Sequence, residues 1–258
     1  GLILGIVHIV NLAHGELMML AAYFTYFLCV KSGMSPFLAM IPVTVVMVLL
    51  GMVIYRLTIR QTLKAPELNQ LILTFGLAMI VSQTVNLIAT SQPRKLSLSY
   101  VSASASIGET SFGTYDFIYT LAAVLILVGL QLFMKRTRIG KAAIAVGQNP
   151  TGARLVGINV DRTYLTIFSI AVGLVGIMGA LFMTRSSIFP LVGGAYTMKS
   201  FCLVAMAGIG NIPAILICSL GLGVAESFLS SFKGVSGWSQ IVFFALIIIV
   251  IMYRSLKW

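Results

Sequence analysis

A series of apolar runs, most of them near the length that crosses a lipid bilayer, makes up the larger part of this 258-residue sequence. A helix needs about 20 consecutive apolar residues to span the hydrocarbon core of a membrane. Because 59% of the residues are hydrophobic and 9% are charged, the runs cannot all be buried in one soluble core. The sequence therefore predicts an all-α, polytopic transmembrane helical bundle that forms a single domain over residues 1–258. Its expected spans are 15–30, 36–56, 68–90, 117–134, 162–183, 212–231 and 239–253.

One further apolar run, 198–209, is too short to cross a membrane comfortably. Glycines, an asparagine and a proline lie at its end, and such residues interrupt helices. We expect a broken or re-entrant helix pair here, with its break facing the cytoplasm. The predicted break residues are Gly208, Gly210, Asn211 and Pro213.

Lysines and arginines gather in alternate connections between the runs, where they set the orientation of a membrane protein. They follow the second run, fill the segment 135–162 and follow the last run, which places these three connections on the cytoplasmic side. The loops 31–35, 91–116 and 184–197 then face outward. This orientation signal accounts for the net charge of +11, so we expect contact with membrane lipid and no nucleic-acid partner.

The beginning of the chain combines an apolar segment with a polar break. Residues 1–10 are about half a span long, so we expect them to be the tail of a helix whose beginning is missing. Beyond them, Asn11, His14 and Glu16 lie among apolar residues. Polar groups are costly in hydrocarbon, so these three either line a translocation pathway or form a solvated helix end in which Glu16 complements the helix dipole. His14-Gly15-Glu16 does not match the H-E-x-x-H zinc motif, and no metal site is expected.

Two features of the later runs bear on packing. Gly173, Gly176 and Gly179 recur at three-residue steps, and small residues at such spacing let membrane helices approach closely. Glu226 lies within an expected span, where a carboxylate must be paired or hydrated. It either stabilises the bundle or lines the pathway and meets an ammonium group of a solute.

The cytoplasmic segment 135–162 carries the signals of a short helix at about 149–158. Asn149 suits the N-cap, Pro150 suits the first helical position, and Gly157 can end the helix. Such a helix is either an interfacial connector or a coupling helix, through which an attached ATPase moves the spans. The candidate coupling residues are Asn149, Pro150, Gly152, Ala153, Arg154, Leu155 and Gly157.

Three blocks of residues carry a resemblance to a known family. V-N-L-A-H-G-E at 10–16, followed by M-L-A-A-Y, resembles the signature N-F-A-H-G-E-x-x-M-L-G-A-Y of permease subunits of branched-chain (hydrophobic) amino-acid ABC importers. That family includes urea and short-amide permeases. The block 140–162 resembles the family's cytoplasmic loop G-R-A-x-R-A-x-x-x-N-x-x-A-x-L-x-G-I-N-x-x-R. A-G-I-G-N-I-P at 207–213 is similar to its G-G-I-G-S-I-P-G-A segment.

The resemblance implies a type II ABC importer-like permease, multi-pass in the bacterial inner membrane. It implies four kinds of partner: two ATP-binding subunits, a second permease subunit in a heterodimer rather than a homodimer, an extracytoplasmic substrate-binding protein, and membrane lipid. It also implies that ATP-Mg is bound and hydrolysed on the partner subunits, so this chain has no catalytic residue and no cofactor of its own. In agreement, the nearest approach to a phosphate-binding loop, 193–200, has Met198 where the second glycine belongs.

Two other classes of membrane protein are alternatives to a permease subunit. An ion-coupled secondary transporter of small solutes would need acids within the membrane, and Glu16 and Glu226 are the candidates. An intramembrane hydrolase would need a nucleophile paired with a base or a metal, and the sequence contains no such paired motif.

Overall fold

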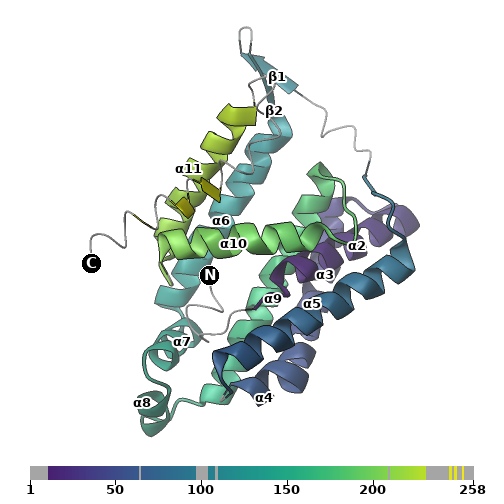
Figure 1. Ribbon diagram of the computed structural model, residues 1–258. Helices are drawn as coiled ribbons and strands as arrows, with labels where there is room; N and C mark the ends of the chain where they lie inside the picture. The colour runs from purple at the N-terminus through teal and green to yellow at the C-terminus, as the bar shows by residue number, and fades with distance from the viewer. Residues whose placement is uncertain are drawn as a thin grey trace. The chain divides into compact units, whose positions relative to one another are not determined.

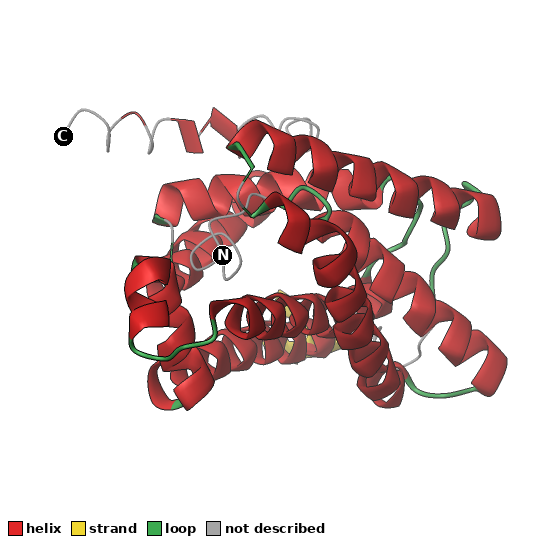
Figure 2. Cartoon of the chain, turned by 90° about the horizontal axis from the view of Figure 1, so that it is seen from below, coloured by secondary structure: helices red, strands yellow, loops and turns green. Residues whose placement is uncertain are grey.

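The computed structural model describes residues 11–63, 65–96, 104–107, 110–208 and 210–230, with a few positions beyond (244, 245, 247, 248 and 252). Helices run through almost all of the described chain (Figure 2). The predicted helix tail at 1–10 lies outside the described residues, and so does most of the predicted span 239–253. The α-helices, labelled in Figure 1, are α2 (His14–Ser32), α3 (Pro36–Ile54), α4 (Arg60–Thr62), α5 (Glu67–Ala89), α6 (Thr114–Arg136), α7 (Arg138–Gln148), α8 (Pro150–Leu155), α9 (Val160–Arg185), α10 (Val192–Ala207) and α11 (Ile212–Ser230). A π-helical turn, η1 (Tyr55–Ile59), lies between α3 and α4.

Within the described residues, four helices are long and apolar enough to cross a membrane. They are Pro36–Thr62, Leu68–Ala89, Phe117–Arg136 and Val160–Arg185. A fifth span is possible if α10 and α11 count as one, since they pass the same test together but are bent by 119°. Helix α2 has 19 residues, and at about 1.5 Å per residue it is also long enough. A polytopic helical bundle with a broken helix pair is therefore confirmed.

The second span is longer than predicted, because the helix continues past residue 56. A π-helical turn, Tyr55–Ile59, joins α3 to α4 and carries the helix on to Thr62. Arg56 and Arg60 therefore lie on the last turns of a helix and not in a loop. π-turns are frequent at functional sites.

Helix α9 packs closely against α3 and α2. A Cβ atom on Gly176 would meet the Met47 side chain of α3 at 3.0 Å, and one on Gly179 would lie 2.6 Å from the Cβ atom of Ala21 of α2. The predicted use of these glycines in close helix packing is therefore seen directly. By contrast, a Cβ atom on Gly221 or Gly223 of α11 would meet none of the described residues within 4 Å.

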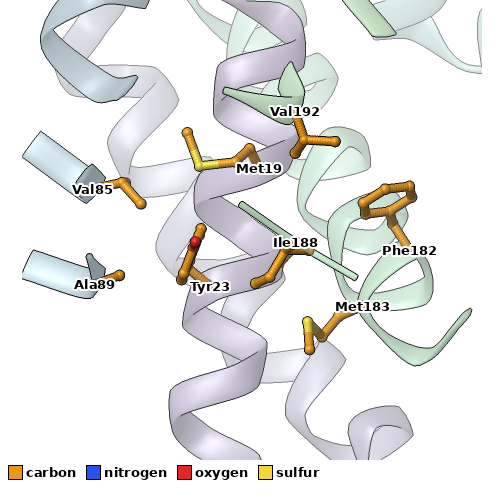
Figure 3. Packing of buried hydrophobic residues seen from close by; sticks show 9 residues of the cluster. Met19, Tyr23, Val85, Ala89, Phe182, Met183, Ile188 and Val192 are labelled. Carbon is orange, nitrogen blue, oxygen red and sulfur yellow. The ribbon is translucent and has the colours of Figure 1, made fainter. Parts of the chain in front are cut away.

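A cluster of buried apolar residues is centred on α2 (Figure 3). Residues of α2 lie between those of α5 on one side and those of α9 and the α9–α10 connection on the other. The members labelled in Figure 3 are Met19, Tyr23, Val85, Ala89, Phe182, Met183, Ile188 and Val192. Because lipid tails are as apolar as these side chains, the cluster stabilises the bundle through close van der Waals packing between the helices.

The C-terminal ends of α5 and α9 are joined through Arg94. Its backbone pairs with that of Ile188 through two hydrogen bonds of 2.9 Å. Its guanidinium donates to the Ala89 carbonyl at 2.8 Å and lies 5.4 Å from the ring centre of Tyr26. Arg94 is thus a structural anchor in the loop predicted to face outward.

The connections contain two elements that the sequence pattern did not predict. Strands β1 (Ser104–Ile107) and β2 (Thr110–Gly113) form an antiparallel hairpin in the segment 91–116, so the all-α bundle carries one small strand pair. Helix α7 fills the basic segment directly after α6, and Thr137 caps it by accepting a 3.0 Å hydrogen bond from the Gly140 N–H. The hairpin and α7 lie at opposite ends of α6 (Figure 1).

The chain divides into two compact units within α10, one ending at Thr197 and the other starting at Met198. The first contains α2 to α9 and the first turns of α10. The second contains the rest of α10 and α11, with Met206 and Leu222 in its own small core.

Candidate functional site

The polar segment before α2 forms a tight turn, which is held by the side chain of Asn11. Asn11 Oδ1 accepts a 2.9 Å hydrogen bond from the Ala13 N–H, which is an Asx-type turn into the helix that begins at His14. Asn11 is 4% exposed and Glu16, in the first helical turn, is 8% exposed. The turn therefore delivers two polar side chains to the interior instead of to solvent.

The start of α2 is tied to α10 and α5 by threonine hydroxyl groups. The Gly15 N–H donates to Thr197 Oγ1 at 2.9 Å, and Thr197 Oγ1 donates to the Leu12 carbonyl at 3.4 Å. Thr74 Oγ1 on α5 accepts from the Leu12 N–H at 3.3 Å. We call Asn11, His14, Glu16, Thr74 and Thr197 the polar junction; it lies wholly within the first unit.

Glycines let the two backbones of the junction touch. A Cβ atom on Gly15 would collide with the Gly193 carbonyl oxygen and with Thr197 Oγ1. A Cβ atom on Gly193 would lie 2.5 Å from Glu16 Oε2 and 2.6 Å from the Gly15 carbonyl carbon. Because such distances are not tolerated, both positions require glycine.

Glu16 lies where the N-terminal turns of two helices meet. It belongs to the first turn of α2, and its carboxylate also lies against Gly193 and Gly194 in the first turn of α10. Helix N-termini carry partial positive charge, so this position suits a carboxylate. The dipole interpretation of Glu16 thus applies to a second helix that the sequence alone could not identify.

Several buried polar atoms of the junction have no hydrogen-bond partner within the described part of the chain. They are Asn11 Nδ2, His14 Nδ1 and Glu16 Oε2. An unsatisfied buried donor or acceptor costs about 1–3 kcal/mol, so native proteins keep few of them, usually where water, an ion or a ligand binds. Their convergence on one helix turn marks the junction as the candidate site.

Glu226, the fourth predicted pathway residue, forms an ion pair in the second unit. Its Oε1 lies 2.7 Å from Lys199 Nζ, which comes from α10 while Glu226 comes from α11. The two side chains are 31% and 24% exposed, respectively. Glu226 therefore has the partner that a carboxylate within a span requires.

The predicted break residues lie between α10 and α11. Gly208 and Gly210 have φ values of 89° and 81°, a region that favours glycine. Asn211 Oδ1 accepts from the Ala214 N–H at 3.2 Å and so caps α11, and Pro213 lies in its first turn. The neighbouring Ile209 lies outside the described residues.

The short helix of the basic segment, α8, spans Pro150–Leu155, which is less than the predicted 149–158. Asn149 Oδ1 accepts from the Gly152 N–H at 2.9 Å, as an N-cap does. At the other end Gly157 has a φ of 85°, its N–H donates to the Arg154 carbonyl, and the Ile158 N–H donates to Ala153.

Side chains of α8 divide into a buried and an exposed set. Ala153 is 4% exposed and packs inward, whereas Leu155 and its neighbour Val156 are 85% and 76% exposed. Two large apolar side chains at such exposure are unusual in a strongly basic connection. They form the apolar tip of α8.

A polar contact that the sequence did not predict joins α9 to the π-turn. Tyr55 is 1% exposed, and its hydroxyl donates to Asp161 Oδ1 at 3.2 Å. Arg60 Nη2 lies 2.8 Å from Asp161 Oδ2. Asp161 is in the first turn of α9, just after the α8 segment, so this contact ties the α8 connection to the helix that continues from α3 into η1 and α4. The only sequence signal for this contact is an acidic residue, Asp161, at the start of a span and close to several basic residues.

The described residues contain no group of three or more His, Cys, Asp or Glu side chains that could hold a metal ion.

Comparison with known proteins decides the family. Residues 1–251 match the family described as "Branched-chain amino acid transport system / permease component". The chain belongs to this permease family. It is accordingly a multi-pass membrane permease component, as its apolar helices also indicate.

Its relatives include permeases of named transport systems. The chain is 26% identical to the high-affinity branched-chain amino acid transport system permease protein LivH of Salmonella typhimurium, over 97% of this chain and 85% of LivH. It is 27% identical to the corresponding protein BraD of Pseudomonas aeruginosa, over 98% of this chain and 86% of BraD. The fructose import permease protein FrcC of Rhizobium meliloti is 27% identical over 94% of this chain and 69% of FrcC. No solved structure gives a significant match.

Proposed function

We propose that this permease forms half of the membrane channel of an ABC importer that takes up branched-chain or other hydrophobic amino acids, or related small amides, across the bacterial inner membrane. The observation that carries this is the similarity to LivH and BraD along almost the whole of both chains. The second permease of the pair is a related but different chain. Two ATP-binding subunits and an extracytoplasmic binding protein complete the importer, and ATP-Mg is bound and hydrolysed on the ATP-binding subunits. This chain is then a transport subunit and not an enzyme.

The polar junction is the proposed part of the translocation pathway. Asn11, His14 and Glu16 have polar atoms without a partner among the described residues at the broken start of α2, and the first turn of α10 lies against Glu16. A solute that carries both an ammonium and a carboxylate group needs alternating acceptors and donors along its route. Because the first turns of α10 contact this helix start, a movement of α10 would change the access to these groups.

Helix α8 is the proposed coupling element. It is short and capped at both ends, and its exposed Leu155 and Val156 suit an apolar pocket on an ATP-binding subunit. The contact of Asp161 with Tyr55 and Arg60 lies directly after α8, so a displacement of α8 would pull on α9 and on the inner end of α3 together. This provides a physical route from ATP hydrolysis to the spans.

Substrate-stimulated ATP hydrolysis tests the proposal and separates its alternatives. The chain would be co-expressed with the permease, ATP-binding and binding-protein subunits encoded beside it, and the purified assembly would be assayed with leucine, with a short amide and with fructose. We expect stimulation by leucine or another hydrophobic amino acid. Stimulation by fructose alone would make the substrate a sugar, as in FrcC. Transport by the lone chain, driven by an ion gradient, would make it a secondary transporter.

A further inference from the structure

A groove of about 350 Å³ lies on the predicted cytoplasmic side, and none of its lining residues belongs to the polar junction or to the apolar tip of α8. One wall is formed by α7 and the other by the turn into α9 and the first turns of α9. The lining residues that matter are Arg138, Ile139 and Ala142 on α7, and Ile158, Arg162 and Thr166 on the other wall. All of them belong to the first unit.

The groove carries two cationic groups and no acid. Arg138 and Arg162 are both exposed, and in the described part of the chain neither is paired with a carboxylate. The acid beside them in sequence, Asp161, is engaged by Arg60 at 2.8 Å and by the Tyr55 hydroxyl. Two guanidinium groups facing one groove suit an anion with several oxygen atoms, because each can donate two parallel hydrogen bonds.

The depth of the groove is set by the helices that flank it. The span of α6 ends at Arg136, just before Arg138, and the span of α9 begins at Val160, just before Arg162. Both arginines therefore lie where hydrocarbon gives way to the headgroup layer. By the positive-inside rule this is the cytoplasmic leaflet, which carries the anionic lipids.

The apolar part of the lining points to the same kind of ligand. Ile139 is 45% exposed although it follows a basic residue, and Ile158 and Ala142 also line the groove. Apolar walls do not help to bind a free anion. A phospholipid carries acyl chains beside its phosphate, and these chains can pack against the apolar walls. We propose that this groove binds the phosphate headgroup of one anionic phospholipid between Arg138 and Arg162, with the start of its acyl chains against Ile139 and Ile158.

An acidic side chain of an ATP-binding subunit is the competing occupant, and the position of the groove disfavours it. The proposed docking surface for a cytoplasmic protein is the exposed apolar tip of α8. The groove instead opens at the predicted cytoplasmic ends of two spans. The lipid site does not depend on which solute is transported.

The test measures lipid binding to the purified permease in a neutral detergent. Binding is detected as a shift in the thermal unfolding temperature of the protein. The probes are phosphatidylglycerol, phosphatidylcholine and inorganic phosphate at matched concentrations. The variants are Arg138→Gln, Arg162→Gln and both together. Lys141→Gln is the matched control, because Lys141 is an exposed base on α7 that does not line the groove. The paired variant Arg138→Lys with Arg162→Lys keeps the charge and removes the forked donors, and it serves if the glutamine variants fold poorly.

We expect stabilisation by phosphatidylglycerol only, with an affinity about fivefold weaker for each arginine removed, since a base near the membrane surface contributes about 1 kcal/mol. The lysine pair should bind with intermediate affinity, and Lys141→Gln should bind as the parent does. Equal stabilisation by inorganic phosphate would overturn the lipid assignment, and so would an equal loss in Lys141→Gln. Unchanged lipid binding with loss of co-purifying ATP-binding subunits in the double variant would assign the groove to a protein contact instead.

Discussion

The backbone N–H of Gly15 donates a 2.9 Å hydrogen bond to the hydroxyl of Thr197, 182 positions further along the chain. This contact holds the broken start of α2 against the first two turns of α10. Gly15 and Thr197 belong to the same compact unit, so the polar junction is a fixed feature of that unit.

Replacing Gly193 by alanine should separate the two helix starts. The added Cβ atom would lie 2.5 Å from Glu16 Oε2, so α10 must shift away from α2. Overpacking of this kind costs about 1–3 kcal/mol, and we expect a lower thermal unfolding temperature in detergent together with reduced uptake. Gly194→Ala is the matched control, because its Cβ atom would be 3.8 Å from Glu16 Oε1, an ordinary contact. Equal behaviour of the two variants would show that the close approach at Gly193 has no consequence.

The Tyr55→Phe variant isolates the contact between the π-turn and α9. It retains the ring, which packs 6.0 Å from that of Phe168, and removes the donor to Asp161. We expect a loss of about 1 kcal/mol in the free energy of unfolding, as is typical of one hydrogen bond. Arg60→Gln should cost only a few tenths of a kcal/mol, because both members of that ion pair are largely exposed. A larger effect for Arg60→Gln would mean that the ion pair, and not the tyrosine hydroxyl, holds the two segments together.

Neutralising Glu226 should destabilise the second unit. Glu226→Gln removes the 2.7 Å partner of the Lys199 ammonium within an apolar helix pair. The cost should be roughly 1–2 kcal/mol, less than for a fully buried pair, because both groups are partly exposed. The double variant Lys199→Gln with Glu226→Gln should recover most of the yield of folded protein. If Glu226→Gln folded normally and still lost uptake, the carboxylate would act on the solute instead.

The apolar tip of α8 should be needed for assembly with ATP-binding subunits but not for folding. Leu155→Asp and Val156→Asp change side chains that are 85% and 76% exposed, so the thermal unfolding temperature should stay unchanged. Co-purification of ATP-binding subunits should fall at least tenfold, which corresponds to about 1.4 kcal/mol of binding free energy. Ile144→Asp is the control, since Ile144 is an exposed apolar residue on α7. Normal co-purification with both α8 variants would exclude α8 as the docking element.

Local patterns predicted the parts of the fold that depend on a few neighbouring residues. Asn149, Pro150 and Gly157 were assigned to the N-cap, the first turn and the end of a short helix, and the structure has them there. The main helices follow from apolar run length, because a membrane-spanning helix satisfies its own backbone hydrogen bonds. The predicted uses of α8 and of the break residues remain predictions.

Two kinds of feature were not predicted from the sequence: irregular or short local elements, and contacts between distant segments. The sequence pattern ended the second span at residue 56, because the π-turn from Tyr55 to Ile59 leaves no periodic signal. Helix α7 was missed because its basic residues interrupt the apolar pattern, and the hairpin β1–β2 because its strands are only four residues each. Gly193 and Thr197 were missed at the site because their importance depends on residues almost the whole chain away.

Uptake into proteoliposomes tests the central claim most directly. The assembly of this chain, the second permease and the ATP-binding subunits would be reconstituted with ATP inside, and binding protein loaded with radiolabelled leucine or another hydrophobic amino acid would be supplied outside. We expect uptake that requires ATP, the binding protein and this chain, and that falls at least tenfold when Asn11 and Glu16 are both replaced by alanine in a normally assembled complex. Uptake of hydrophobic amino acids that continued without this chain, or without ATP, would contradict the account.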